Sequence, residues 1–549
     1  MRSTTAHSLA CALAFLSALS LFGCEGLVIG PEVPDPEWPA PPEWPDSWEE
    51  LPACENPWPG PFEAPETAAP SGLVRLFAEG LQPMHRDLVL HVEVRDSEGD
   101  PDESFEDPLF LSAEPSQGFE LLSVSEPVLG RLSVRYRLTE PGLYTLKATL
   151  ENSSRTGSTQ IVGYETNLSI WEIEVTPADW ESLTEGDPAE RARVPVTLVL
   201  EGVSYPAQMR VHGGSSRYYA KKSWRIDLDD DEEGQSVELP DGSDHLVLRA
   251  EYPDKTMLRN YLSSQLLRSG TLVPTFRIEP IHLRINGEFY GLMQRAERID
   301  GDFLDSRGLN NDGQLYEADP PHTLGGVGGN LTPLDPELYE QAYQHHRGPI
   351  EYVDLIELIE EVLSPDGAVS ERPIADSVAI GEVLAYAAVE ALIQNQDHLR
   401  KNFYLYRDTE ANLESRWRFL PWDMDLTWGH LWSEEDDILG EEITTDGSLW
   451  MGLEDDFDAW NHNALLHRVL GDPLHEATYE EYILHLVDDV FNEEFVDERI
   501  ENMLCRTTPE LLADTRKRAD NDEYLDRVDE LYEFLDGKRA QVWEELGGG

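Results

Sequence analysis

Basic residues are scarce in this 549-residue sequence, in which 41 Lys and Arg stand against 108 Asp and Glu and the formal net charge is -67 at pH 7. A field of that sign repels phosphate backbones and anionic lipid headgroups. We therefore expect no nucleic-acid binding and no attachment to a membrane through a basic patch. The acidic excess is explained by solubility alone, and a preference for basic partners is the alternative.

Cysteine is also scarce, with four residues in the chain. Cys11 and Cys24 lie in the N-terminal segment, so Cys54 and Cys505 remain for the body of the protein. These two could form one disulfide in an oxidising compartment, but their separation in sequence leaves the pairing open. Neither a CxxC motif nor a Cys/His cluster is present, which excludes the common zinc-binding patterns.

Long apolar runs are missing after the N-terminus, so we expect no membrane-spanning helix. Residues 1–24 combine a basic start at Arg2 with a short apolar core that ends in Leu21-Phe22-Gly23-Cys24. This pattern is typical of a secretory signal peptide, and its end resembles the bacterial lipoprotein box, in which the Cys is acylated. We expect an exported protein that is lipid-anchored through Cys24 in the cell envelope, at the outer membrane or cell surface.

Composition divides the remaining chain into three segments. Residues 25–72 are rich in Pro, Glu and Trp, which favours a semi-rigid tether. Residues 73–166 contain short alternating runs separated by turn signals, which predict a small β-sandwich of immunoglobulin-like shape. Residues 167–540 begin with strand patterns and continue with helical ones, which predicts an α+β domain.

Periodicity places the elements of this third segment. The expected strands are 193–201, 205–212, 223–228, 245–249, 281–286 and 289–294. The expected helices include 350–363, 376–394 and 476–492. The hydrolase motifs Gly-x-Ser-x-Gly and His-Glu-x-x-His are missing, so the sequence gives no support to that chemistry.

The stretch from 394 to 429 places polar residues around a predicted hairpin. Asp397 and Asn402 lie in the loop that follows a predicted helix. Phe403–Tyr406 and Trp417–Leu420 are then predicted to pair as antiparallel strands. Asn402 and the residues that follow the second strand are therefore expected at the same end of the hairpin.

Two aspartates, Asp423 and Asp425, follow that hairpin. Side chains two positions apart in an extended chain face one side, and carboxylate and amide oxygens are suitable ligands for a divalent cation. The structural alternative is an exposed turn in a very acidic protein. The flanking Trp422 and Trp428 favour a shielded pocket instead.

The order of these features resembles the catalytic core of protein kinases, in which a helix, an Asp-x-x-x-x-Asn loop, a hairpin and a metal-binding Asp follow one another. The loop reads Asn395-Gln396-Asp397 in place of the kinase His-Arg-Asp, and Asp-Phe-Gly is not present. The sequence is instead similar to the spore-coat-protein-H-like (CotH) family of atypical kinases. The stretches that carry the resemblance, in the family's order, are MRVHGGSSRYYAKKSWRIDL (209–228), EYPDKTMLRNYLSSQLLR (251–268), IHLRINGEFYGLMQRAERID (281–300), KNFYLYRD (401–408) and FLPWDMDLTWG (419–429).

The resemblance implies a two-lobed, kinase-like domain over residues 167–540 that uses ATP with Mg²⁺ or Mn²⁺. It implies that Asp397 accepts the proton of the attacking hydroxyl. It also implies that Asn402 binds the metal together with Asp423 or Asp425, and the sequence does not show which of the two is the main ligand.

Further nucleotide contacts follow from the same comparison. Lys222, with Lys221 as its rival, would touch the phosphates. Arg400 and Lys401 would contact phosphate or pair with the nearby carboxylates. Glu297 follows the Asn-Gly hairpin, where a kinase hinge would lie, and would contact the nucleotide.

Two supporting residues have structural explanations at this stage. Arg259, on the predicted helix, is expected to form an internal ion pair. Asp254 lies near the start of that helix, where an N-cap is the competing explanation. The Gly213-Gly214-Ser215-Ser216 segment is expected to be a turn, or a short cover over phosphate.

The implied activity is transfer of the ATP γ-phosphate to Ser or Thr hydroxyls of a protein substrate. The acidic surface favours a substrate rich in Lys, Arg and Ser. The alternative is a non-catalytic surface adhesion or assembly protein on the same scaffold, because fold does not fix function and an exported protein meets little ATP.

Overall fold

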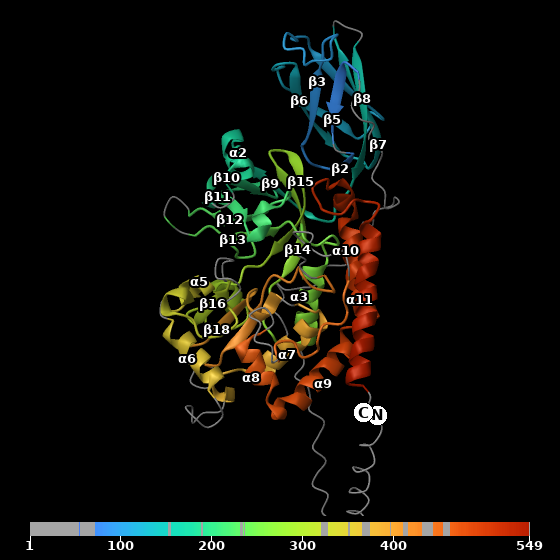
Figure 1. The fold of residues 1–549 in the computed structure, drawn as a ribbon. Coiled ribbons are helices and arrows are strands. Elements are labelled where there is room, and N and C mark those ends of the chain that lie inside the picture. Colours follow the sequence, from blue (N-terminus) through green and yellow to red (C-terminus); the bar gives the residue numbers. More distant parts are fainter. Residues whose placement is uncertain are drawn as a thin grey trace, which may run out of the picture. The chain divides into compact units, whose positions relative to one another are not determined.

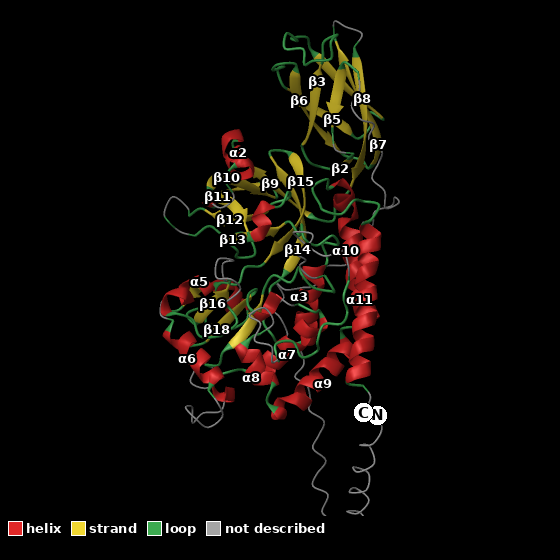
Figure 2. Ribbon diagram, in the orientation of Figure 1, coloured by secondary structure: helices red, strands yellow, loops and turns green. Residues whose placement is uncertain are grey.

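Strands dominate the first half of the described chain and helices the second half, as Figures 1 and 2 show. The protein is therefore an α+β protein, as its sequence predicts. The computed structural model describes residues 54, 72–78, 80–151, 155–187, 190–230, 234, 236–319, 328–349, 352–364, 374–395, 397–409, 415–430, 443–453 and 462–547. The predicted signal peptide with Cys24, and the predicted tether apart from Cys54 and Gly72, lie outside the described residues.

Among the described residues, the segment from Val74 to Tyr164 forms two four-stranded sheets. The first has the order β1 (Val74–Phe77), β3 (Leu88–Val94), β6 (Arg131–Leu138), β5 (Phe119–Val124). The second has the order β2 (Leu81–Pro83), β8 (Thr156–Tyr164), β7 (Gly142–Leu150), β4 (Leu109–Glu114). Alternate residues of both sheets are buried in one shared core, as the period of two in a strand requires. The immunoglobulin-like shape stays a prediction.

The next strands close into a barrel in the order β10-β11-β12-β13-β15-β14-β9. Their bounds are β9 (Ser169–Glu174), β10 (Val194–Leu200), β11 (Val203–His212), β12 (Ser223–Leu228), β13 (His245–Arg249), β14 (Ile278–Ile285) and β15 (Glu288–Ala296). Each strand expected between 193 and 294 is present, with ends shifted by a few residues. The helix α2 (Pro177–Glu185) and the 3₁₀ turn η3 (Ser215–Tyr218) lie between barrel strands. Buried Trp171, Trp224 and Met209 help to fill the barrel interior.

The turn between β14 and β15 accounts for the Asn-Gly pair of the family pattern. Asn286 and Gly287 have φ values of +52° and +85°, and two-residue hairpin turns of this kind favour Asn followed by Gly. Gly291, further along β15, has a φ of +154°, and a Cβ there would lie 2.7 Å from Asp514 Oδ2. Asp514, which directly follows a helix far along the chain, therefore leaves no room for a side chain at position 291.

A second sheet has the order β17 (Tyr343–Arg347), β16 (Gln314–Ala318), β18 (Phe403–Arg407), β19 (Arg418–Pro421). The described helices after β13 are α3 (Arg259–Gly270), α4 (Gly301–Ser306), α5 (Tyr339–Ala342), α6 (Val353–Leu363), α7 (Ile380–Leu392), α8 (Ala464–Leu470), α9 (Pro473–Asp489), α10 (Glu493–Ala513) and α11 (Tyr524–Glu545). Short 3₁₀ turns are η5 (Pro336–Leu338), η6 (Ile374–Asp376) and η7 (Asp397–Leu399). One hydrophobic core runs through the sheet and helices, and the expected helices appear as α6, α7 and α9.

The helix α10 joins segments that are far apart in sequence. Its Cys505 forms a disulfide with Cys54, which is the pairing that the sequence left open. Its buried Glu510 accepts hydrogen bonds from Tyr164 Oη at 2.8 Å and from Thr166 Oγ1 at 2.6 Å. None of the described helices has the length and apolar character needed to span a bilayer.

Candidate active site

The hairpin β18–β19 brings both halves of the candidate site to one end, as the sequence predicts. Phe403 lies opposite Pro421, and Trp422 N donates to the carbonyl of Asn402 at 3.1 Å. Asn402 and Asp423 adopt φ values of +63° and +54°, a region that Asn and Asp enter more readily than most residues. The side-chain amide of Asn402 donates to the Asp423 carbonyl at 3.4 Å.

Asp397 begins the turn η7 and pairs with Lys401, whose Nζ lies 2.9 Å from Asp397 Oδ2. Burial disfavours charge on Lys401, but the carboxylates of Asp397, Asp423 and Asp425 outweigh burial and raise its pKa. Lys401 therefore stays protonated and links the loop carboxylate to the aspartate pair. The N–H of Arg400 donates to the Asp397 carbonyl at 3.5 Å, and a phosphate contact by either basic residue stays a prediction.

A cation that sequence reasoning missed bridges the aspartate pair. Arg249, at the end of β13, donates from Nη2 to Asp423 Oδ1 at 2.5 Å and to Asp425 Oδ2 at 3.1 Å. Its Nε donates to Glu251 Oε1 at 2.7 Å. The available signal was an arginine and a glutamate close together, Arg249 and Glu251, at the start of the Asp-Lys-x-x-x-Arg-Asn stretch.

Burial and mutual charge separate the two aspartates. Burial, and then the negative charge of Asp423, raise the pKa of Asp425 well above its ordinary value. Burial also favours the neutral acid at Asp423, but Arg249 and then Lys401 outweigh it and hold the pKa of Asp423 below its ordinary value. The charge of Arg249 is therefore too small to keep both carboxylates ionised, and a further cation would stabilise them.

The oxygens that Arg249 does not use fit a divalent cation. Asp423 Oδ2, Asp425 Oδ1 and Asn402 Oδ1 accept no hydrogen bond from the described residues. Within that part of the chain, no group of three or more His, Cys, Asp or Glu side chains forms a metal cage. Mg²⁺ is commonly held by one or two carboxylates together with water and phosphate oxygens, so this donor set suits it.

The start of α3 supports the site from behind. Asp254 Oδ2 accepts two backbone N–H groups at the start of the helix, including that of Arg259 at 2.9 Å. Its other oxygen binds the Arg259 guanidinium, which confirms the internal ion pair. The N-cap position itself is Leu258, so Asp254 binds the first backbone N–H groups from outside the cap position. Asn260 donates to Glu251 Oε1 at 3.2 Å and accepts from Met424 N at 3.1 Å. The helix therefore fixes the residue that separates the two aspartates.

The two tryptophans are buried as the sequence predicts. Trp422 is 7% exposed and its ring packs on Phe276, with centroids 4.9 Å apart. Trp428 is fully buried, and its Nε1 donates to Ser263 Oγ at 3.1 Å. The Asp423 side chain between them is 32% exposed, so a ligand can reach the pair while the tryptophans shield its surroundings.

The structure gives the two candidate lysines other partners. Lys222 Nζ donates to the Arg217 carbonyl at 2.7 Å. Lys221 is fully buried, and its Nζ lies 2.8 Å from Asp514 Oδ2. Among the described residues, neither lysine has a hydrogen bond to the aspartate pair. Phosphate binding by Lys222 stays a prediction.

Glu297, the residue after β15, is held by the Arg307 side chain and by the backbone of Arg277. Its two oxygens accept from Arg307 Nη1 at 3.1 Å and Arg307 Nη2 at 2.7 Å, and the backbone N–H of Arg277 donates to it at 3.0 Å. An internal ion pair therefore accounts for the side chain, and its contact with a nucleotide stays a prediction.

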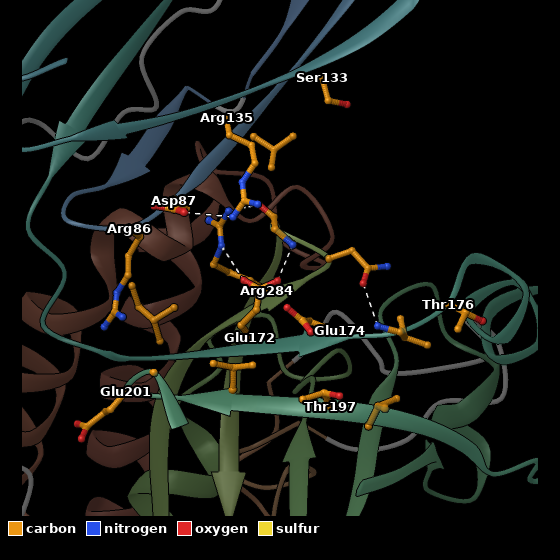
Figure 3. A pocket seen from close by; sticks show the side chains of 18 of the residues that line it. Arg86, Asp87, Ser133, Arg135, Glu172, Glu174, Thr176, Thr197, Glu201 and Arg284 are labelled. Carbon is orange, nitrogen blue, oxygen red and sulfur yellow. Dashed lines mark hydrogen bonds and ion pairs between the residues drawn. The ribbon is translucent and has the colours of Figure 1, made fainter. Parts of the chain in front are cut away.

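A cleft of about 860 Å³ lies away from these residues, between the first four-stranded sheet and the barrel (Figure 3). Two of its arginines pair with carboxylates of the lining: Arg135 Nη2 lies 3.1 Å from Asp87, and Arg284 Nε lies 3.2 Å from Glu172. None of the site residues expected from the sequence lines it. We therefore assign the candidate active site to Asp397, Asn402, Asp423 and Asp425.

A buried acid under the loop gives a pH-dependent prediction. Burial raises the pKa of Glu390 on α7 to about 8, and the nearby His398 stays neutral because burial lowers its pKa to about 4. Folded Glu390 thus keeps a proton that the unfolded chain releases above its ordinary pKa of 4.5. Below pH 4.5 the contribution of Glu390 to the free energy of unfolding is complete. As the pH rises from there toward 8, this contribution falls by about 1.4 kcal/mol per pH unit.

The Glu390→Gln variant should lose this pH dependence. In urea titrations, the difference in free energy of unfolding between wild type and variant should change by about 3 kcal/mol between pH 5 and pH 7.5, in the direction that favours the wild type at low pH. A difference that stays constant across this range would contradict a raised pKa at Glu390.

The sequence matches the model of the CotH kinase protein family over residues 209–542, which is more than half of the chain. The protein therefore belongs to the CotH family, and all the stretches that carried the resemblance lie inside the match. It is also 24% identical to inner spore coat protein H of Bacillus subtilis (strain 168) over 384 residues, which cover 70% of this chain and 98% of that protein.

Proposed function

We propose that this protein is an atypical protein kinase that transfers the γ-phosphate of ATP to Ser or Thr hydroxyls of a protein substrate. In this proposal the barrel and the helical part with its four-stranded sheet act as the two lobes. The observation that carries it is the convergence of Asp397, Asn402, Asp423 and Asp425 at one end of the β18–β19 hairpin. Membership of the CotH family supports it.

Asp397 has the position and partner for a general base. It would accept the proton of the substrate hydroxyl while that oxygen bonds to the γ-phosphorus and the bond from phosphorus to the bridging oxygen breaks. Lys401 holds the Asp397 carboxylate in place through their 2.9 Å contact. Asn402 is the next residue in the loop, and its side-chain amide donates to the Asp423 carbonyl. This contact joins the loop of Asp397 to the segment that carries the aspartate pair.

Asp423, Asp425 and Asn402 would hold Mg²⁺ or Mn²⁺ through the oxygens that Arg249 leaves open. The bound cation supplies charge neutralisation of the donor's phosphates. Arg249 keeps the two carboxylates close together, since it donates to one oxygen of each. The side chains of this protein thus contribute both the anionic ligands and a fixed guanidinium beside them.

The second candidate is a non-catalytic surface adhesion or assembly protein. The observation in its favour is that Arg249 and Lys401 already pair with the carboxylates of the site, as they would in a scaffold without a ligand. The similar protein is named as a spore coat protein, which fits a role in assembly.

We place the protein outside the cytoplasm, at the cell surface or in the envelope. The match to a spore coat protein and the lipoprotein-like start support this location, with Cys24 as the lipid attachment site and no other membrane contact. Fatty-acid labelling of wild type and Cys24→Ala tests the anchor. A protein substrate rich in Ser with basic neighbours is the partner that the net charge of -67 favours.

The decisive experiment incubates the purified full chain with γ-labelled ATP and Mg²⁺ or Mn²⁺, beside Asp423→Ala. Because Asp423 supplies ligand oxygens, the variant should lose both metal-dependent nucleotide binding in calorimetry and label transfer. Asp488→Ala, an exposed acid on α9, is the matched control and should behave as wild type. Absence of nucleotide binding by the wild type with either metal would exclude the kinase and favour the adhesion protein.

A further inference from the structure

A buried carboxyl group lies at the base of the loop that carries Asp397 (residues 397–402). Glu390 is on α7 and is 1% exposed. It faces Tyr386, one turn earlier on the same helix, and Asn395, where the chain leaves the helix toward the loop. No basic side chain is among the causes of its shifted pKa. A buried acid without a counter-ion costs stability, and such groups are common at functional sites.

Five polar atoms of these three residues make no fully formed hydrogen bond with the described residues. They are both carboxyl oxygens of Glu390, the amide oxygen and nitrogen of Asn395, and the hydroxyl of Tyr386. Buried polar groups in folded proteins nearly always have partners. The terminal torsions of Glu and Asn side chains are broad, so small rotations allow these atoms to satisfy one another.

The proton on Glu390 decides which pairing is possible. A neutral carboxyl group has one O–H donor and a carbonyl acceptor, and a side-chain amide likewise has donors and an acceptor. Neutral Glu390 can therefore donate to Asn395 Oδ1 while it accepts from Asn395 Nδ2. An ionised carboxylate only accepts, so it would leave Asn395 Oδ1 without a donor. The reciprocal pair of two hydrogen bonds thus requires the neutral acid.

Asn395 and His398 connect this pair to the loop. The backbone N–H of Asn395 donates to the Glu390 carbonyl at 2.9 Å, and the Asn395 carbonyl accepts from the ring of His398. His398 directly follows Asp397 in the chain and is 1% exposed. Its ring packs edge-on against Tyr386, with centroids 5.7 Å apart. The buried side of the loop is therefore held by residues that contact the carboxyl group.

We propose that Glu390 is a positioning residue, whose reciprocal hydrogen bonds with Asn395 hold the loop of Asp397 in place until the acid loses its proton. The consequence for catalysis rests on the proposed function. A general base must lie within hydrogen-bond reach of the hydroxyl that it deprotonates. Release of the loop therefore slows transfer, although the nucleotide and metal ligands of Asp423 and Asp425 stay in place.

Two other titratable groups face the buried acid, and neither changes charge near neutral pH. Burial raises the pKa of Tyr386 well above its ordinary value and lowers the pKa of His398 to about 4. Of the elements packed on α7, α9 contributes Tyr479, whose pKa burial also raises, and β19 contributes Arg418, which pairs with Glu382 at 3.4 Å. Neither α3 nor α8 contributes a charged group to the shift at the acid.

Infrared difference spectroscopy on the full chain tests the protonation state. Between pH 6 and pH 10, wild type should lose the carbonyl stretch of a carboxylic acid with a midpoint near the pKa of about 8. Glu390→Gln should lack this band. Glu481→Gln, at an exposed acid on α9, is the control and should keep it. The same band with the same midpoint in Glu390→Gln would overturn the proposal.

Hydrogen exchange of the backbone amides of residues 397–402, measured with millisecond labelling, tests the loop. At pH 6 wild type and Glu390→Gln should be equally protected, because Gln keeps a reciprocal amide pair with Asn395. At pH 9 wild type should exchange about tenfold faster than Glu390→Gln, since the ionised form then dominates about tenfold. Glu390→Met cannot pair and should exchange fast at both pH values. Equal protection of wild type and Glu390→Gln at pH 9 would contradict the positioning role.

Transfer from γ-labelled ATP separates this inference from the proposed function. With both correct, kcat of wild type should fall about tenfold between pH 7 and pH 9 relative to Glu390→Gln, with KM for ATP unchanged. Transfer with the same pH profile in both proteins would overturn the positioning role and leave the kinase intact. Loop exchange that depends on the Glu390 proton, without transfer by wild type at any pH, would support the pair and exclude the kinase.

Discussion

Asp397→Asn should slow phosphoryl transfer by about 10²- to 10⁴-fold, the usual contribution of a general base. Asn has almost the same size and can still accept a hydrogen bond from Lys401, which lies 2.9 Å from the Asp397 carboxylate. It cannot accept the hydroxyl proton. Initial rates of label transfer measure the effect, and calorimetry should show metal and nucleotide binding close to wild type.

Lys401→Met is the informative comparison for that variant. Lys401 touches Asp397 but takes no proton in the proposed reaction, and its loss also removes a positive charge from Asp423 and Asp425. It should therefore slow transfer and tighten metal binding, because the removed ammonium competes with the metal for these carboxylates, whereas Asp397→Asn should affect transfer alone. Wild-type rates in Asp397→Asn would exclude Asp397 as the base, even if the protein proved to be a kinase.

The second large effect is on stability. Asp514→Ala should lower the free energy of unfolding by about 3–5 kcal/mol, because it leaves the ammonium of Lys221 buried without a counter-ion. Both side chains are fully buried, and Asp514 also accepts the N–H of Leu292 at 3.0 Å. This pair attaches the end of α10 to the barrel. Urea unfolding followed by tryptophan fluorescence measures the loss.

A double-mutant cycle shows whether the ion pair itself is responsible. Lys221→Met combined with Asp514→Ala removes the unpaired charge, so the double variant should be less destabilised than the sum of the two single variants. Lys222→Met is the neighbouring control, because among the described residues the Lys222 ammonium donates only to the Arg217 carbonyl. This variant should lower the free energy of unfolding by about 1 kcal/mol. Additive effects of Lys221→Met and Asp514→Ala would show that the pair contributes no coupling.

Most of the secondary structure could be predicted because it depends on local periodicity. The alternating run at 205–212 became β11, and the 3,4 spacing at 376–394 became α7. The hairpin after Asn402 was equally local, since its two strands are close neighbours in sequence. The barrel closure was not predictable in this way, because β9 pairs in parallel with β14 across more than a hundred residues.

The residues of the candidate site also divide into those that the local sequence indicated and one that only the folded structure shows. Asp397, Asn402, Asp423 and Asp425 were found because one short stretch holds them all. Arg249 was missed because it reaches the aspartate pair from a strand far earlier in the chain. Ion pairs depend on which side chains meet in space, and a single sequence carries no periodic signal for that.

The sequence by itself thus determined the family of the protein, the α+β class and the order of its strands and helices. Only the tertiary structure decided which charged side chains form ion pairs. Lys221 pairs with Asp514, Arg249 bridges the aspartates, and Glu297 pairs with Arg307. The physical reason is that element type follows from neighbours along the chain, whereas the electrostatics of a site follow from packing between elements that the chain brings together only on folding.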